Sequence, residues 1–235
     1  KNIALILTFF LCIGSKNNHH DVNATQVKTS GHKDHNDTRS EHSSANEHMH
    51  QSSVENLIER FESPERDAYQ QPEKVLEFLG DLQGQTIMDI GAGSGYFSVK
   101  LAEKGAKVIA ADVDDEFQEF LQRRIEKSNL DNIETRKLPY DSPNLNEDEV
   151  DMVLIVNTYH HIENRPEYFT KVKKGTKPEG QLVIIDFFKS EIPVGPPLDH
   201  KLPIDVVVNE LKKAGYNSFE VKVDFLPYQY IIKAK

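Results

Sequence analysis

The sequence is nearly free of cysteine, and this shortage limits the chemistry available to the chain. Cys12 is the only cysteine among 235 residues. A single thiol forms no intramolecular disulfide, no zinc site built from several cysteines and no CxxC redox centre. Nothing in the sequence therefore requires an oxidising compartment, and nothing in it excludes one.

An excess of positive charge is also missing. Lys and Arg number 28 against 38 Asp and Glu, which gives a formal net charge of -10. Proteins that track the phosphates of nucleic acids generally present a basic surface. We therefore expect a small-molecule substrate and no nucleic-acid partner.

The N-terminal apolar run at residues 3–13 is short. It falls well below the roughly 20 residues that a membrane-spanning helix needs, but it matches the core of a secretory signal. We predict that residues 1–15 are a signal peptide or membrane-targeting segment, so that the protein is exported, periplasmic or membrane-associated. Lipidation at Cys12 and a cytoplasmic location stay open as alternatives.

Residues 16–53 contain almost no large apolar side chains. Such a segment cannot bury enough surface to offset the entropy of ordering the chain, so we predict a disordered linker. Imidazoles are common metal ligands, and a metal-handling role for this segment is an alternative to a plain polar tether. Seven of the ten histidines lie here: His19, His20, His32, His35, His42, His48 and His50.

Residues 54–235 carry the pattern of one folded domain. Helical spacing begins at Val54, and from Thr86 short apolar strands alternate with amphipathic helices. This alternation predicts a doubly wound α/β fold, in which helices cover both faces of a mainly parallel sheet. The last two strand-like segments, FEVKVDF and YQYIIKA, predict a closing antiparallel hairpin.

The first predicted strand leads into a glycine-rich turn, MDIGAGSGYF, which is typical of a nucleotide-like cofactor site. Glycines let a ligand approach bare backbone, and the following helix offers free N–H groups. Asp89 precedes the glycines, at a place suited to the loop N–H groups or to a ligand ammonium, and would repel a pyrophosphate. Tyr96 stands where a dinucleotide fingerprint needs a small residue. Asp112 ends the next strand, where a carboxylate accepts hydrogen bonds from ribose hydroxyls.

The motifs MDIGAGSGYFSVKLAEKG, VIAADV and VDMVLIVNTYHH resemble those of class I S-adenosylmethionine-dependent methyltransferases, in particular the branch with quinone-biosynthesis and other small-molecule enzymes. The similarity covers about residues 72–235. It implies a Rossmann-like seven-stranded sheet of order 3-2-1-4-5-7-6 with strand 7 antiparallel, and S-adenosylmethionine as cofactor. The cofactor-binding residues that we derive from the motifs and this resemblance are Asp89, Gly91, Gly93, Gly95, Tyr96, Asp112, Val113, Asp141 and Asn157.

The methyl acceptor is less well defined, because methyl transfer needs no obligatory catalytic signature. A histidine after the fourth strand, His160 or His161, is our candidate general base for a hydroxyl acceptor. Packing of one of these rings under its loop is the alternative. Two flanking segments are expected to cover the pocket, and Arg66 or Tyr69 in the first is a candidate for the cofactor carboxylate. The candidate acceptor contacts are Tyr69, Tyr159, Phe188 and His200, and we assign no metal ligand.

Two other functions compete with a methyltransferase. A nicotinamide-dependent oxidoreductase would share the ribose-binding acid, but Tyr96 argues against it. An exported metal-handling protein would use the histidines of residues 16–53 and keep the folded domain as a non-catalytic scaffold. The sequence leaves the oligomeric state open.

Overall fold

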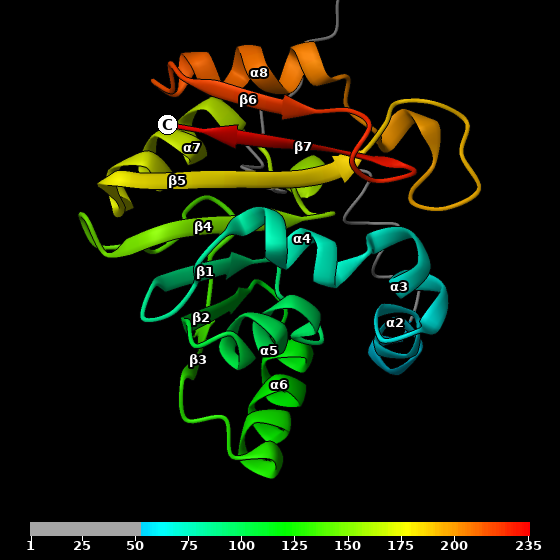
Figure 1. Cartoon of the computed structure of the whole chain (residues 1–235), viewed down its shortest axis with the longest axis vertical. Coiled ribbons are helices and arrows are strands. Elements are labelled where there is room, and N and C mark those ends of the chain that lie inside the picture. Colours follow the sequence, from blue (N-terminus) through cyan, green and yellow to red (C-terminus); the bar gives the residue numbers. More distant parts are fainter. Residues whose placement is uncertain (1–52) are drawn as a thin grey trace, which may run out of the picture. The chain divides into compact units, whose positions relative to one another are not determined.

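A computed structural model describes residues 53–235, and its central feature is a seven-stranded sheet. The strand order is β3-β2-β1-β4-β5-β7-β6, and β7 runs antiparallel to both β5 and β6, whereas the other neighbouring strands are parallel (Figure 1). The order and the closing hairpin confirm the predicted fold. The strands are β1 (Thr86–Ile90), β2 (Lys107–Asp112), β3 (Ile133–Lys137), β4 (Val150–Val156), β5 (Thr176–Phe187), β6 (Phe219–Lys222) and β7 (Gln229–Ala234).

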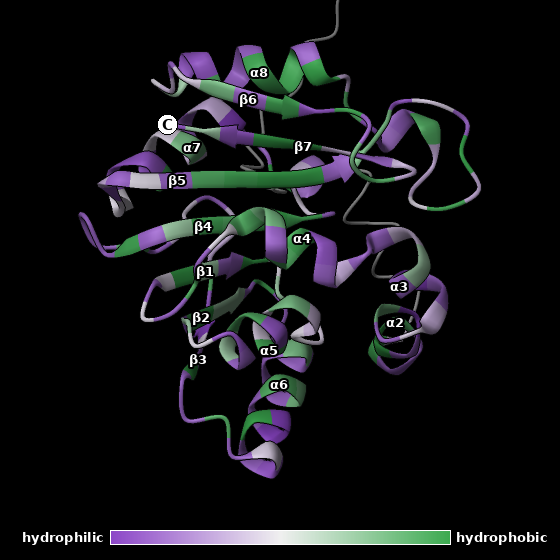
Figure 2. Ribbon diagram, in the orientation of Figure 1, coloured by the Kyte–Doolittle hydropathy of each residue, from purple (hydrophilic) through white to green (hydrophobic). Residues whose placement is uncertain are grey.

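Helices cover the sheet and form a separate core with each of its faces. Successive residues of a strand point to opposite faces, so Ile87 packs with α4, α5 and α6, whereas Met88 packs with α7 and α8. The middle of β5 is hydrophobic along its length (Figure 2), as expected for a strand buried on both faces. The helices are α2 (Val54–Phe61), α3 (Pro64–Gln70), α4 (Pro72–Leu79), α5 (Tyr96–Glu103), α6 (Asp115–Ser128), α7 (Arg165–Gly175) and α8 (Ile204–Lys213), with short 3-10 turns η1 (Tyr159–His161) and η2 (Leu198–His200).

Helix α3 was not predicted, although its start has a clear local cause. The Ser63 hydroxyl accepts a hydrogen bond from the Arg66 N–H at 3.2 Å, and Pro64 occupies the first helical turn. A serine cap followed by proline is a strong helix start. At the other end of the domain β6 stops at Lys222, earlier than the predicted strand.

The predicted signal or targeting segment at residues 1–15 lies outside the described residues, as does the predicted linker apart from Ser53, which caps α2. Both therefore remain predictions. No helix between residues 53 and 235 has the length and apolar character needed to cross a membrane.

Candidate active site

A cavity of about 550 Å³ lies at the carboxyl ends of β1, β2, β4 and β5. The last residue of each of these strands lines it, and in Figure 1 their arrowheads point toward α2 and α3, which also contribute walls. This is the edge at which doubly wound sheets bind their ligands. Of the predicted site residues, the lining includes Gly91, Gly93, Asp112, Val113, Asn157, Tyr69, His160, His161 and His200.

The loop after β1 needs glycine at each predicted position for a definite reason. Gly91, Gly93 and Gly95 have φ angles of 76°, 53° and 81°, which L side chains rarely adopt. A Cβ at Gly91 would lie 2.3 Å from Thr158 Oγ1, and one at Gly95 would lie 2.4 Å from Leu121 Cδ1. The loop therefore passes against its neighbours with bare backbone.

Asp112, at the end of β2, anchors the glycine loop from one side of the cavity. Its Oδ2 accepts the Gly93 N–H at 2.9 Å, and its Oδ1 accepts the Asp114 N–H at 3.0 Å. Burial raises the pKa of this carboxyl group. Carboxylate oxygens each have a second lone pair, so the Asp112 carboxylate at the cavity wall can also accept ligand hydroxyls.

Asp89 lies beneath the loop rather than among the cavity-lining residues. It is only 3% exposed, and its Oδ2 accepts a hydrogen bond from the Ser98 hydroxyl at 2.7 Å. Its partner is thus a side chain of α5 and not an N–H group of the glycine loop. Burial raises the pKa of Asp89 to about 6.

This raised pKa predicts a pH-dependent cost of folding. The folded carboxyl group ionises near pH 6 and the unfolded one near its ordinary pKa of 3.8, so stability is lost as the pH rises through that window. We expect Asp89→Asn to gain up to about 3 kcal/mol of unfolding free energy relative to the native chain between about pH 4 and pH 7. Urea denaturation at both pH values measures this gain. Asp205→Asn, an exposed carboxylate, is the control, and parallel pH profiles for the Asp89 variant and the native chain would refute the prediction.

Helix α2 covers the glycine loop with an aromatic side chain. A Cβ at Gly93 would lie 3.3 Å from the Phe61 ring, and this ring stacks on Phe117 with centroids 5.8 Å apart. Phe61 and Phe117 both line the cavity. Sequence reasoning missed both, because their helical periodicity indicated ordinary core positions.

An ion pair fastens the end of α2 to the loop and to α6. The Arg124 guanidinium donates to both carboxylate oxygens of Glu62 at 2.7 and 3.2 Å and to the Ser94 carbonyl at 2.9 Å. Bidentate pairs of this kind fix orientation as well as adding energy. The end of α2 is therefore held in a fixed position over the glycine loop.

Arg66 of α3 brings a buried positive charge to the cavity wall. Its guanidinium carbon lies 3.9 Å from the centroid of the Tyr96 ring, and its Nε has no hydrogen-bond partner. Burial lowers the pKa of Arg66, although nearby groups oppose this effect. Tyr96 does not line the cavity, since its hydroxyl donates to Asp67 and its ring supports Arg66. The structure thus shows a supporting role for the Tyr96 side chain, and its predicted contact with the cofactor stays a prediction.

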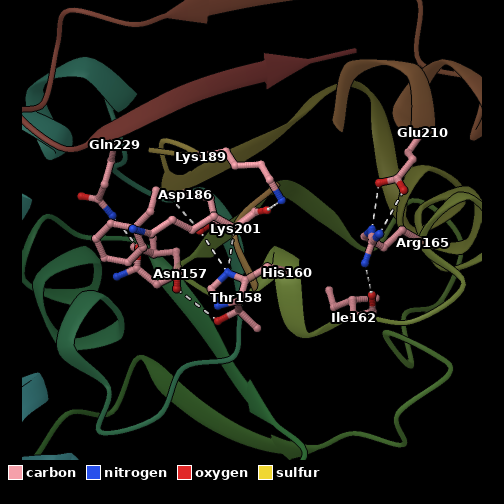
Figure 3. Close-up of polar contacts among 12 residues, drawn as sticks. Asn157, Thr158, His160, Ile162, Arg165, Asp186, Lys189, Lys201, Glu210 and Gln229 are labelled. Atoms are coloured by element: carbon pink, nitrogen blue, oxygen red, sulfur yellow. Dashed lines mark hydrogen bonds and ion pairs between the residues drawn. The ribbon is translucent and has the colours of Figure 1, made fainter. Parts of the chain in front are cut away.

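Asn157 joins a closed set of three amides behind the cavity wall. Its Nδ2 donates to Gln70 Oε1 at 3.3 Å, Gln70 Nε2 donates to Gln229 Oε1 at 3.0 Å, and Gln229 Nε2 donates back to Asn157 Oδ1. These residues follow β4, end α3 and begin β7. The network therefore ties the α3 cover to the centre of the sheet, and Figure 3 shows its contact between Asn157 and Gln229. Asn157 also lines the cavity.

His160 and Asp186 form a buried pair at the cavity wall (Figure 3). His160 Nδ1 lies 3.0 Å from Oδ1 and 2.9 Å from Oδ2 of Asp186, and the two residues are 7% and 3% exposed. Asp186 Oδ1 also accepts the Phe187 N–H at 2.8 Å, which fixes the carboxylate. Because Nδ1 is engaged, Nε2 is the ring nitrogen left to exchange a proton with a ligand. The His161 ring lies 4.3 Å from that of His160, centroid to centroid.

Asp186 was not predicted, although the sequence contains a signal for it. The acid interrupts the strand segment LVIIDFF, in which all the remaining residues are apolar and suit a buried environment. A buried carboxylate needs a partner, and the histidines after β4 supply one because β4 and β5 are neighbours.

Besides Asp89, Gly95 and Tyr96, three further predicted site residues are absent from the cavity lining. Tyr159 is fully buried, stacks on Phe169 and donates its hydroxyl to Glu210 at 2.8 Å, so it does not reach the cavity. Phe188 packs against the core that the sheet forms with α7 and α8, and Phe187 lines the cavity in its place. Neighbouring residues at the end of a strand point in opposite directions.

Asp141 is the third of these residues. Its side chain is exposed and absent from the cavity lining, while its carbonyl accepts a hydrogen bond from Lys171 at 2.9 Å. Leu138 and Tyr140 line the cavity in this loop instead. Within residues 53–235 no group of three or more His, Cys, Asp or Glu side chains is arranged to hold a metal ion.

Comparison with known proteins agrees with this geometry. A family model described as a methyltransferase domain matches residues 88–184. A crystal structure of an S-adenosylmethionine-dependent methyltransferase from Aquifex aeolicus is 28% identical, with a TM-score of 0.72, over 78% of this chain and 98% of that one.

Two curated relatives match over shorter stretches. Phosphoethanolamine N-methyltransferase 3 of Arabidopsis thaliana is 32% identical over 115 residues, which are 48% of this chain and 22% of that protein. Demethylmenaquinone methyltransferase of Clavibacter sepedonicus is 28% identical over 119 residues, 49% of this chain and 46% of the relative. The chain thus spans less than half the length of these curated relatives.

The strand order, the glycine loop and these comparisons identify the described part of the chain as a class I S-adenosylmethionine-dependent methyltransferase domain. Its cofactor is S-adenosylmethionine. The site fits this group, since bare backbone at Gly91 and Gly93, the Asp112 carboxylate and the unpartnered Arg66 Nε suit a nucleoside that carries an amino-acid tail.

Proposed function

We propose that the protein transfers the methyl group of S-adenosylmethionine to a small-molecule acceptor, with His160 as general base. The observation that carries the proposal is the buried His160–Asp186 pair at the edge of the sheet where the cavity lies. The relatives named above act, by their names, on phosphoethanolamine and on demethylmenaquinone, both of which are small molecules. Their acceptors differ, so they support the size class of the acceptor and not its identity.

Each part of the cavity has a separate task in this proposal. Asp112 holds the ribose, the glycine loop holds the methionine portion, and Arg66 Nε donates to the carboxylate of that portion. When bound, the cofactor supplies a methyl group that is already activated by the positive charge on sulfur. The chain therefore has to orient the acceptor, exclude water and accept a proton from it.

Asp186 holds the His160 ring and prepares it for the proton. Its carboxylate accepts from Nδ1–H, which keeps the lone pair of Nε2 available. When Nε2 takes a proton, the imidazolium is stabilised by the adjacent carboxylate. General-base assistance of this kind typically raises a rate by about 10² to 10⁴-fold.

An assay of S-adenosylhomocysteine formation by the full chain tests the proposed function. We expect the product to form when the chain is given S-adenosylmethionine and the small-molecule fraction of a cell extract, and not when it is given the macromolecular fraction. Calorimetry with S-adenosylmethionine and S-adenosylhomocysteine accompanies the assay. The absence of binding to either compound, or turnover with the macromolecular fraction alone, would contradict the proposal.

The predicted export or membrane association depends on residues 1–15, and the metal-handling alternative depends on the histidines of residues 16–53. Both segments lie outside the described residues. We propose an exported or membrane-associated enzyme on the strength of the apolar run at residues 3–13. Fractionation of cells followed by N-terminal sequencing of the mature chain tests this location.

A further inference from the structure

The carboxylates that line the cavity all lie on one side of it, whereas its two lining arginines, Arg60 and Arg66, come from α2 and α3. Among the described residues, its carboxylates are Asp112, Asp114 and Glu116, and all three come from the end of β2 and the start of α6. That side is assigned to the ribose and adenine. A cationic acceptor at the other end of the cavity would therefore meet no lining carboxylate.

The opposite end of the cavity, at η1, the end of β5 and η2, is lined by imidazoles. His160, His161 and His200 all contribute to the lining there. Asp186 lies behind His160, and both of its carboxylate oxygens are within 3.0 Å of Nδ1. The Asp186 carboxylate is already engaged by His160 Nδ1 and the Phe187 N–H and does not line the cavity, so an ammonium group buried at this end would have no lining carboxylate to pair with. An anion that forms there is stabilised by a protonated imidazole.

Flat apolar surfaces frame the same end. The rings of Tyr69 and Phe187 lie with centroids 6.0 Å apart, and both line the cavity. The segment after β5 presses onto Phe187, since a Cβ at Gly195 would lie 2.8 Å from that ring. Pro196 and Ile162 add rigid apolar walls. Aromatic rings favour stacking and edge contacts with other planar rings.

We propose that the acceptor is a planar aromatic compound with an acidic hydroxyl, a phenol, which is methylated on its oxygen. This inference rests on the proposed function and specifies its substrate class. The phenol proton passes to His160 Nε2, and the phenolate oxygen forms a bond to the methyl carbon. The electron pair of the broken carbon–sulfur bond stays on sulfur, which becomes a neutral thioether, and the imidazolium later releases its proton to water.

Equilibrium binding tests the substrate class without requiring turnover. The full chain, saturated with S-adenosylhomocysteine, is titrated with catechol and 4-nitrophenol, and with benzylamine and phenethylamine as cationic compounds of similar size. We expect the phenols to bind at least about tenfold more tightly than the amines, because each amine has to bury an ammonium group with no lining carboxylate to pair with. Equal or tighter binding of the amines, or no binding of either phenol, would overturn the substrate class.

A comparison of two phenols tests the role of His160. At about pH 8 4-nitrophenol is mostly ionised, whereas only about 1% of phenol is ionised, as for the tyrosine side chain. We expect His160→Gln to slow methylation of phenol by up to about 10²-fold, because only the ionised fraction then reacts, and to leave the rate with 4-nitrophenol within a few-fold of the native rate. A merely structural role for His160 would slow both phenols alike.

The outcomes of these tests are separable from those of the proposed function. If S-adenosylhomocysteine binds the chain but amines are methylated in preference to phenols, the phenol proposal fails while the methyltransferase proposal stands. Equal losses for the two phenols in His160→Gln would overturn the base role that the phenol proposal requires. Asp205→Asn, with an exposed carboxylate on α8, is the control variant and should behave as the native chain.

Discussion

Replacing Asp112 by alanine is expected to weaken binding of S-adenosylmethionine by about 10² to 10⁴-fold. The Asp112 carboxylate ends β2 at the cavity wall, and in the proposed function it accepts both ribose hydroxyls. Hydrogen bonds to a charged group contribute about 1.5 to 3 kcal/mol each, and about 1.4 kcal/mol corresponds to a tenfold change in affinity. Isothermal titration calorimetry on the full chain measures the loss.

Two further variants separate ligand binding from loop support. Asp112 also accepts the Gly93 and Asp114 N–H groups, so Asp112→Asn, which keeps one acceptor oxygen, should lose less affinity than the alanine variant. Asp115→Ala removes a neighbouring carboxylate that forms an exposed ion pair with Lys137, and it should bind as the native chain does. If the Asp112→Ala variant bound S-adenosylmethionine with native affinity, Asp112 would not contact the cofactor.

Replacing Asp186 by asparagine should slow methyl transfer to phenol by up to about 10²-fold at about pH 8, with little effect on the ionised 4-nitrophenol, while leaving cofactor binding unchanged. The Phe187 N–H donates to Oδ1, so we expect the amide nitrogen of the variant to take the position of Oδ2, which lies 2.9 Å from His160 Nδ1, slightly nearer than Oδ1 at 3.0 Å. An N–H there donates to Nδ1, which places the ring proton on Nε2. His160 then offers a donor where the acceptor needs a base.

Nitrogen-15 NMR of the His160 ring checks this tautomer change independently of any acceptor. The native ring should carry its proton on Nδ1 and the Asp186→Asn ring on Nε2. Calorimetry with S-adenosylhomocysteine supplies the folding control, because the glycine loop and Asp112 do not contact Asp186. An unchanged tautomer, or an unchanged rate with 4-nitrophenol and phenol alike, would show that Asp186 does not act through His160.

The cofactor half of the site was predictable because its determinants are local. Strand, acid and glycines follow one another within MDIGAGSGYF, and the backbone geometry of that loop requires glycine whatever surrounds it. The place of Asp112 was equally predictable, since parallel strands end at one edge of the sheet and an acid that ends the next strand must lie beside the loop. The fold itself followed from the strand and helix alternation together with the family resemblance.

The acceptor half depended on contacts between distant segments. His160 and Asp186 are 26 residues apart and meet only because β4 and β5 pair in one register. Helix α3 brings Arg66 over Tyr96, and neither residue alone indicates that approach. The sequence also did not show which of the neighbouring side chains at η1 reaches the cavity. In the structure the turn buries Tyr159 and directs His160 to the cavity.

The sequence by itself determined the sheet, the glycine loop and the acid that ends the second strand, because short-range backbone sterics and hydrophobic periodicity act within single segments. Tertiary structure alone decided which histidine meets a carboxylate, which phenylalanine lines the cavity and how α2 and α3 cover it. Those outcomes depend on strand register, in which a shift of one residue turns each side chain to the opposite face. The register is fixed by packing of the whole sheet, so no single segment contains it.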